Sequence, residues 1–368
     1  MIHKRINMCR KSKAVLLLII SASLIFPAFP YTPVYSAGAY EAFYIGDSQA
    51  STTLKNLDYQ DVAGSGSWAA EAIYETGAIG IMKGLGNRQF GSSTLVTREE
   101  AIALAYTAAG REAEGQMAAE VLDNTRRRED KKNDATSMWY DGFLQLAAQD
   151  GLISQEDLND ALKDQSTLEP ADFNRKAPVT RQEMAFWLAK VLDLEPVYGQ
   201  QRIFNNYNDW KSADPVKVPY IESILRGNIM TGDGAGYFRP LQPLNREQAA
   251  QIMKNAGEFI LPALNLEKKM GTIEDISYEE DYSTASGFII TRIDIRNING
   301  RLHRITTHLP IDYSGSYRSE QDKSILMADE KEIVVYKNGM LGNSSYLDIG
   351  DRIEYIVSSE NIVKFVKV

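Results

Sequence analysis

Cysteine, histidine and long apolar runs are all scarce in this sequence. Its single cysteine, Cys9, excludes an intrachain disulfide, and a chain of 368 residues can bury enough core without one. Apart from one histidine near the start, only His303 and His308 occur, five apart in an expected strand and so on opposite faces. They form neither a metal pair nor a catalytic dyad, so we expect no metal and no cofactor.

The longest apolar run, 14–26, is too short to span a bilayer comfortably. Five cations and no acid precede it, and the small residues 37–39 follow it, which together predict a secretory signal peptide. A retained N-terminal anchor is the alternative. Removing five of 40 cations against 49 acids changes the net charge from −9 to 35 − 49 = −14. Nucleic acid and anionic membrane are therefore poor partners for the mature chain.

One pattern occurs three times, and internal repetition of this kind determines the architecture. In each copy a phenylalanine precedes an arginine by eight residues, an aliphatic residue stands two before the arginine, and a capping residue directly before it. The phenylalanine–arginine pairs are Phe90 and Arg98, Phe173 and Arg181, and Phe238 and Arg246.

Each copy extends upstream in the same way. A residue that tolerates a left-handed backbone at a helix end precedes the phenylalanine. An aliphatic residue lies seven positions before this helix-end residue. The second copy fits with an insertion near 155–172. Aromatic and acidic positions also recur in two copies each. The helix-end residues are Gly80, Gly151 and Asn228; the aliphatic ones Ile73, Leu144 and Ile221; the aromatic ones Trp68 and Trp139; the acidic ones Asp61 and Asp209.

The second helix of each unit has a clear start signal. Thr97 with Glu100, Thr180 with Glu183, and Asn245 with Gln248 have capping-box spacing. The arginine that follows the cap lies at the positive end of the helix dipole, where a cation is disfavoured by about 0.3–1 kcal/mol. Two interpretations stay open: an anion site, because arginine and free helix N–H groups both attract anions, or an ion pair with a nearby acid.

These repeats resemble S-layer homology (SLH) repeats. The resemblance rests on Trp-x-x-x-x-Ile, the Gly80–Gly84 segment Gly-Ile-x-x-Gly and Thr-Arg-x-Glu at fixed spacing, and covers about 56–261. It implies an all-α, pseudo-threefold, trimer-like domain. It further implies binding of secondary cell-wall polysaccharide of Gram-positive bacteria, often through a ketal-pyruvylated sugar, with the repeat arginine as a ligand.

Nine residues are therefore candidates for carbohydrate binding. Tryptophans at such positions are more often core than sugar contacts, yet both stay candidates. The candidates are Arg98, Arg181, Arg246, Trp68, Trp139, Asp61, Asp209, Gly84 and Gly232.

The pattern changes from helical to alternating after Pro262. Two strong hairpin turns, Asn299-Gly300 and Asn338-Gly339, separate short strands, which predicts a C-terminal all-β small barrel, OB-like or SH3-like. The expected organisation is a signal peptide (1–39), a leader (40–55), three repeats (56–113, 114–198, 199–263), a linker (264–269) and the barrel (270–368).

Three hypotheses for function follow. The first is a non-catalytic cell-surface protein, secreted and anchored to wall polysaccharide, that displays the barrel. The second is a wall-metabolising enzyme active in the barrel, although no nucleophile or carboxylate pair stands out there. The third is a structural surface protein whose repeats contact other surface proteins.

Overall fold

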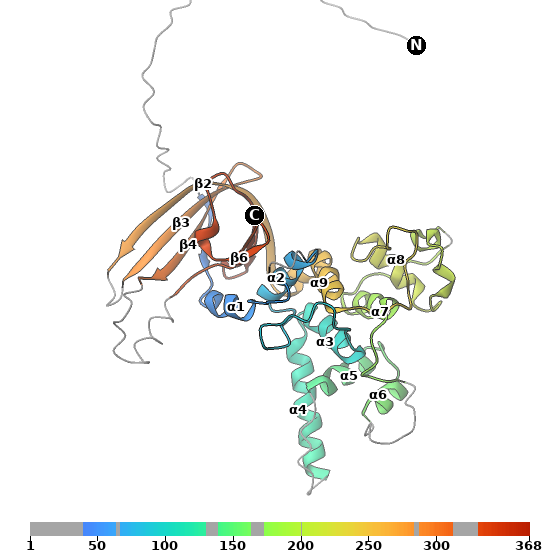
Figure 1. The fold of residues 1–368 in the computed structure, drawn as a ribbon. Helices are drawn as coiled ribbons and strands as arrows, with labels where there is room; N and C mark the ends of the chain where they lie inside the picture. The colour runs from blue at the N-terminus through green and yellow to red at the C-terminus, as the bar shows by residue number, and fades with distance from the viewer. Residues whose placement is uncertain are drawn as a thin grey trace, which may run out of the picture. The chain divides into compact units, whose positions relative to one another are not determined.

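The computed structural model describes residues 40–63, 67–129, 139–162, 173–199, 201–282, 287–311 and 330–368, with side chains of 125–129 left aside. The predicted signal peptide and residues 163–172 of the predicted insertion lie outside these ranges. Residues Ala39–Val368 form one compact unit (Figure 1). Along the chain, one strand of the β-barrel comes first, then the helical part, then the remaining strands.

The helical part contains the predicted pairs of helices and several shorter ones. Every helix in the described ranges is too short or too polar to cross a lipid bilayer. The helices are α1 (Ala50–Asn56), α2 (Ala70–Ala78), α3 (Arg98–Ala108), α4 (Glu112–Glu129), α5 (Trp139–Gln149), α6 (Gln155–Leu162), α7 (Arg181–Val191), α8 (Val218–Arg226), α9 (Arg246–Asn255) and α10 (Gly257–Ala263), with 3-10 turns at Ile203–Asn206, Trp210–Ser212 and Ser344–Tyr346.

The local features predicted from the repeat are confirmed in all three copies. Each second helix, α3, α7 and α9, begins with the expected capping box, in which side chain and backbone exchange hydrogen bonds. The three helix-end residues have positive φ, namely 84° at Gly80, 69° at Gly151 and 52° at Asn228. The three repeat phenylalanines are buried. Ser154 and Asp157 exchange hydrogen bonds in the same way at the start of α6.

The three copies are joined by a closed ring of backbone hydrogen bonds. Val96 N–H donates to the carbonyl of Leu244 (2.9 Å), Leu244 N–H to Val179 (3.0 Å), and Val179 N–H back to Val96 (2.8 Å). These are the aliphatic residues two before each repeat arginine. The spacing that defines the repeat therefore places equivalent backbone groups against one another.

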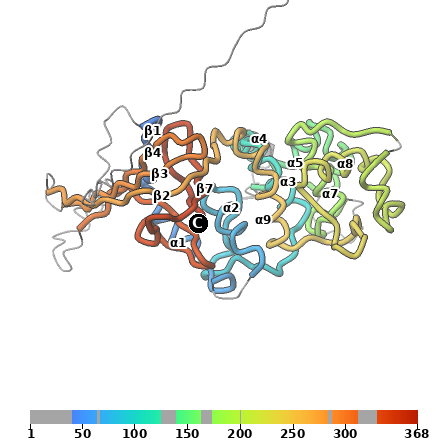
Figure 2. The backbone as a smooth tube through the Cα atoms, turned by 90° about the horizontal axis from the view of Figure 1, so that it is seen from above, coloured from blue at the N-terminus to red at the C-terminus, as the bar shows by residue number. Residues whose placement is uncertain are grey.

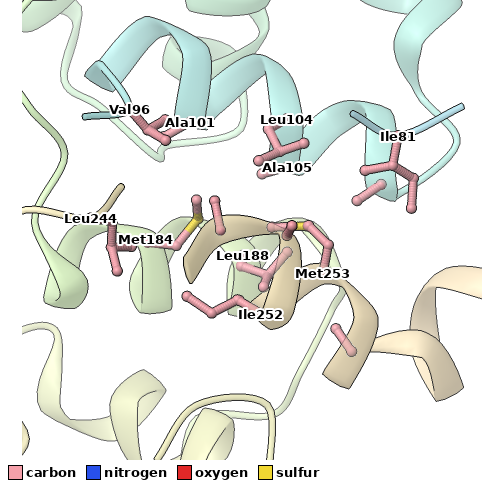
Figure 3. Close-up of a cluster of buried hydrophobic side chains, with 14 of the residues drawn as sticks. Ile81, Val96, Ala101, Leu104, Ala105, Met184, Leu188, Leu244, Ile252 and Met253 are labelled. Atoms are coloured by element: carbon pink, nitrogen blue, oxygen red, sulfur yellow. The ribbon is translucent and has the colours of Figure 1, made fainter. Parts of the chain in front are cut away.

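Side chains of the second helices fill the centre of this ring. Leu104 of α3, Leu188 of α7 and Ile252 of α9 point toward one another in Figure 3. Trp187 of α7 is buried, and its Nε1–H donates to the carbonyl of Leu152 at 3.2 Å. Figure 2 shows α3 beside α5 and α7, its contact partners.

The β-barrel closes through six strands. Strand order is β1-β4-β3-β2-β7-β8, and β1 pairs in parallel with both β4 and β8, which closes the circle; β5 and β6 extend from β8. Both predicted hairpin turns are present, and Asn338 and Gly339 have the positive φ values such turns require. The strands are β1 (Tyr40–Gly46), β2 (Leu266–Asp281), β3 (Phe288–Asn297), β4 (Leu302–Pro310), β5 (Val335–Lys337), β6 (Met340–Gly342), β7 (Arg352–Ser358) and β8 (Ile362–Lys367).

Two segments differ from the sequence-based assignment. Residues 40–55 were assigned to a leader, but they contain β1, a strand of the barrel, and α1. Residues 264–269 were assigned to a linker, but β2 begins at Leu266. Tyr44 of β1 is 5% exposed and lies in the barrel core with Ile305 and Tyr355. A partner strand more than 250 residues away leaves no local signal, so β1 was missed.

Candidate functional site: a groove at Arg246

A groove of about 250 Å³ lies where residues from all three copies meet. Its lining includes the loop after α2, residues 80–85, the α3 side chain Glu100, Trp139 and Tyr140 of α5, and Arg246 of α9. The loop and α3 belong to the first copy, α5 to the second and α9 to the third. The ring of copies therefore builds a site that no single copy contains.

Arg246 is held in this groove by carbonyl groups. Its Nε donates to the Phe90 carbonyl at 2.8 Å, its Nη2 donates to the Lys83 carbonyl, and its guanidinium lies 4.8 Å from the Phe90 ring centre. No carboxylate in the described ranges lies within ion-pair distance of it. Burial lowers the pKa of Arg246, opposed by the nearby charge of Glu100. The cation is thus fixed in place without an acid that neutralises it directly.

Two acids also line the groove. Glu100 is occupied, since its Oε2 accepts the backbone N–H and the hydroxyl of Thr97 in the capping box. Glu112 stands at the start of α4. An anion in the groove would be attracted by Arg246 and Lys83 and repelled by these two carboxylates. It must therefore lie close to the guanidinium to be bound.

Trp139 gives the groove an aromatic wall. It is 42% exposed, and its ring packs against Phe143 with centres 4.5 Å apart. A fixed, half-exposed indole suits the apolar face of a sugar ring. Trp68 is 61% exposed and is not among the residues that line this groove. The core interpretation was therefore wrong for both tryptophans, and only Trp139 lies at Arg246.

Arg181 of the second copy contacts the loop of the third copy in the way that Arg246 of the third contacts the loop of the first. Its Nε donates to the Phe238 carbonyl at 2.8 Å, its Nη2 to the Thr231 carbonyl at 2.6 Å, and the guanidinium lies 4.9 Å from the Phe238 ring. Burial lowers its pKa as well. Two of the three repeat arginines therefore follow the pattern that leaves the charge open to an anion.

Arg98 departs from that pattern. It lies 5.3 Å from the Phe173 ring but forms an ion pair with Glu183, 2.8 Å from Nη2 to Oε1. The carbonyl equivalent to Lys83 and Thr231 belongs to Ser154, three residues after the helix end, and it accepts the first hydrogen bond of α6 instead. Arg98 therefore takes a carboxylate partner where Arg246 and Arg181 take carbonyl groups.

The two acidic candidates cap a loop. Asp61 accepts backbone N–H groups of Phe90 (2.8 Å) and Gly91 (2.7 Å), and Asp209 accepts those of Phe238 (3.0 Å) and Arg239 (2.7 Å). Burial acts to raise the pKa of Asp61, but the N–H donors outweigh it and hold the pKa below its usual range. Both carboxylates position the loop that carries the repeat phenylalanine.

The two glycine candidates allow close packing. A Cβ on Gly84 would lie 2.5 Å from the Tyr59 ring, and one on Gly232 would lie 2.3 Å from the Tyr207 ring. Gly84 also lines the groove, so its backbone stands within reach of a ligand. Gly232 holds the equivalent position near Arg181, whose Nη2 bonds the preceding residue, Thr231.

Two polar networks, the first of them wholly buried, were not predicted from the sequence. Arg175 pairs with Glu99 and with Asp141, all three buried, two residues after a repeat phenylalanine. In the barrel, His303 contacts the Tyr355 hydroxyl through Nδ1 and Glu41 through Nε2 at 3.0 Å. Neither network was visible from spacing, because the partners are far apart in the chain. No metal-ligand cluster of three or more residues occurs in the described ranges.

Comparison with known families agrees with this geometry. Residues 58–102 and 206–250 match the S-layer homology domain. These two SLH domains are the first and third copies, offset by the same 148 residues as Phe90 and Phe238. The second copy and the barrel lie outside the matches, and no curated protein matches the chain. SLH domains attach proteins to bacterial cell walls, so their presence indicates a cell-surface or S-layer-associated protein.

Proposed function

We propose that this protein is secreted and held on a Gram-positive cell wall by its three repeats, which bind an acidic, pyruvylated secondary cell-wall polysaccharide. The second copy acts as a third SLH repeat in a pseudo-threefold unit. The closed ring of hydrogen bonds between Val96, Leu244 and Val179 supports this arrangement, as do the capping boxes of all three copies.

The observation that carries the proposal is Arg246 in its groove. A half-buried guanidinium held by carbonyl groups keeps its charge available, and a carboxylate ligand would complete a charge-assisted pair. Trp139 beside it would stack on the sugar that bears the carboxylate. Because Arg98 is already paired with Glu183, its site contributes less to binding than that of Arg246.

Arg246 and Arg98 provide a matched pair for the test. Purified walls are incubated with the mature protein, with Arg246→Ala and with Arg98→Ala, and the bound fraction is measured over a salt series. We expect Arg246→Ala to lose at least tenfold in affinity, and Arg98→Ala to bind nearly as the parent does. Equal losses, or retention by Arg246→Ala, would contradict the role of the groove. Walls stripped of the acidic sugar should hold none of the three.

The barrel is proposed to be a non-catalytic module displayed by the anchor. Its buried His303 is engaged on both ring nitrogens, by Tyr355 and by Glu41, which favours a structural role. An assay for release of soluble glycan from walls by the whole mature protein tests this. Release that His303→Gln abolishes would instead support the wall-enzyme hypothesis.

A further inference from the structure

A second cavity, of about 550 Å³, adjoins the Arg246 groove. The two share Gly80, Met82, Lys83 and Gly84 as lining residues, so the loop after α2 forms a common wall with one hollow on each side. The far wall of the second cavity comes from α1 and from the turn at residues 86–89. A polymer bound at Arg246 could therefore continue over this loop.

The second cavity has a cationic lining. Lys55, Lys83 and Arg88 contribute to it, and none of the described residues that line it is acidic. This contrasts with the chain as a whole, which carries 49 acids against 40 cations. A local cationic surface on an acidic protein favours a negatively charged ligand there.

The backbone of Arg88 points to the same conclusion. Its φ is 58°, a left-handed conformation that residues other than glycine, asparagine and aspartate seldom adopt. The third copy has Gly236, with φ of 86°, at the same position two before the repeat phenylalanine. The first copy thus places a cation where the fold favours glycine, and residues held in such conformations cluster at functional sites.

An ion pair alone is a weak reason for this arginine. Arg88 pairs with Asp58, but both side chains are more than half exposed, and pairs of this kind contribute little to stability. Asp58 is not among the residues that line the cavity, whereas Arg88 is. Arg88 therefore contacts Asp58 outside the cavity and also contributes to the cavity wall.

We propose that this second cavity is an additional anion subsite for the same polysaccharide, where Lys55, Lys83 and Arg88 bind a carboxylate or phosphate group on a sugar next to the one at Arg246. The subsite rests on the proposed function of the groove. It makes the affinity depend on more than one acidic sugar, because Arg246 lines only the groove and Lys55 and Arg88 line only the second cavity.

The test uses the mature protein and purified secondary cell-wall polysaccharide, with affinity measured by calorimetry and unfolding followed by circular dichroism. The variants are Arg88→Gly, Arg88→Gly with Lys55→Gln, Asp58→Asn and Arg246→Ala. We expect Arg88→Gly to unfold no earlier than the parent, because it restores the residue of the third copy, and yet to bind about fivefold more weakly. The double variant should bind more weakly still, and Asp58→Asn should bind as the parent does or better.

The outcomes distinguish failure of the subsite from failure of the groove. Full affinity of the Arg88→Gly variants alongside loss in Arg246→Ala would overturn the subsite and leave the groove intact. An equal loss in Asp58→Asn would also overturn it, since the ion pair would then account for the effect. Failure of the parent to bind would overturn the groove and the subsite with it. Hydrofluoric acid treatment of the polymer identifies the anion: the Arg88→Gly deficit disappears if the group is a phosphate and persists if it is a carboxylate.

Discussion

Truncating Tyr44 tests whether the barrel depends on a strand that comes before the repeats. Tyr44 lies on β1, is 5% exposed, and packs edge-on against His303 and Tyr355 with ring centres 5.5 and 5.9 Å apart. Replacing a buried aromatic residue with alanine destabilises a protein by about 3–5 kcal/mol. Since domains are stable by about 5–15 kcal/mol, Tyr44→Ala should remove a large part of the stability of the barrel.

The neighbouring Phe43 is the matched control. It lies on the same strand and is 56% exposed, because alternate side chains of a strand point to opposite faces. Phe43→Ala removes an aromatic side chain of similar size with little loss of burial, so we expect a change of about 0.5 kcal/mol or less.

Urea unfolding can follow the two parts of the molecule separately. All four tryptophans, Trp68, Trp139, Trp187 and Trp210, lie in the helical part, so tryptophan fluorescence reports on the repeats. Near-ultraviolet circular dichroism of the tyrosines includes the barrel. We expect Tyr44→Ala to move the dichroism transition to lower urea and the fluorescence transition much less. Equal behaviour of the Tyr44 and Phe43 variants would refute the assignment of β1 to the barrel core.

Three further predictions concern charged side chains inside the fold or partly covered by it. Asp61→Ala should lower the free energy of unfolding by about 2 kcal/mol, because hydrogen bonds to a charged group are strong. The pKa of Asp61 is lowered in the folded protein, so the stability of the parent should fall as the pH drops below about 4. Urea unfolding at several pH values should show a smaller fall in the variant. Glu332→Gln should act in the opposite direction: burial raises the pKa of Glu332, so its contribution to stability declines as pH rises above about 4.3, and the variant should lack that decline in urea titrations at several pH values. Arg175→Met should lower the free energy of unfolding by about 3–5 kcal/mol, since it leaves the buried carboxylates of Glu99 and Asp141 without this cation, and thermal unfolding measures the loss.

Repeated local chemistry is what sequence analysis predicted best. A capping box such as Thr97 with Glu100, a left-handed Gly80 and a buried Phe90 each depend on a few neighbouring residues. Threefold repetition then separated pattern from chance. The ring of Val96, Val179 and Leu244 follows from the same spacing, because equivalent positions in a cyclic arrangement meet equivalent partners.

Pairings between distant segments were not predictable in the same way. Glu41 meets His303 across more than 260 residues, and β1 joins β4 and β8 from the other end of the described chain. No local spacing encodes such contacts. The predicted barrel was therefore correct in kind, while its closing strand was assigned to a leader; its OB-like or SH3-like subtype stays a prediction.

The repeat arginines show where repetition misleads. Their shared position after a helix cap predicted one role for all three, but the chemistry at each depends on the loop of the next copy. Lys83 and Thr231 lie in short loops and offer their carbonyls to Arg246 and Arg181. In the second copy the equivalent carbonyl, that of Ser154, accepts the N–H of Leu158 in α6, and Arg98 pairs with Glu183. Each repeat arginine thus begins a capped helix in the same way. Its charge is free for a ligand only where carbonyl groups of the neighbouring loop, and not a carboxylate, accept its N–H groups.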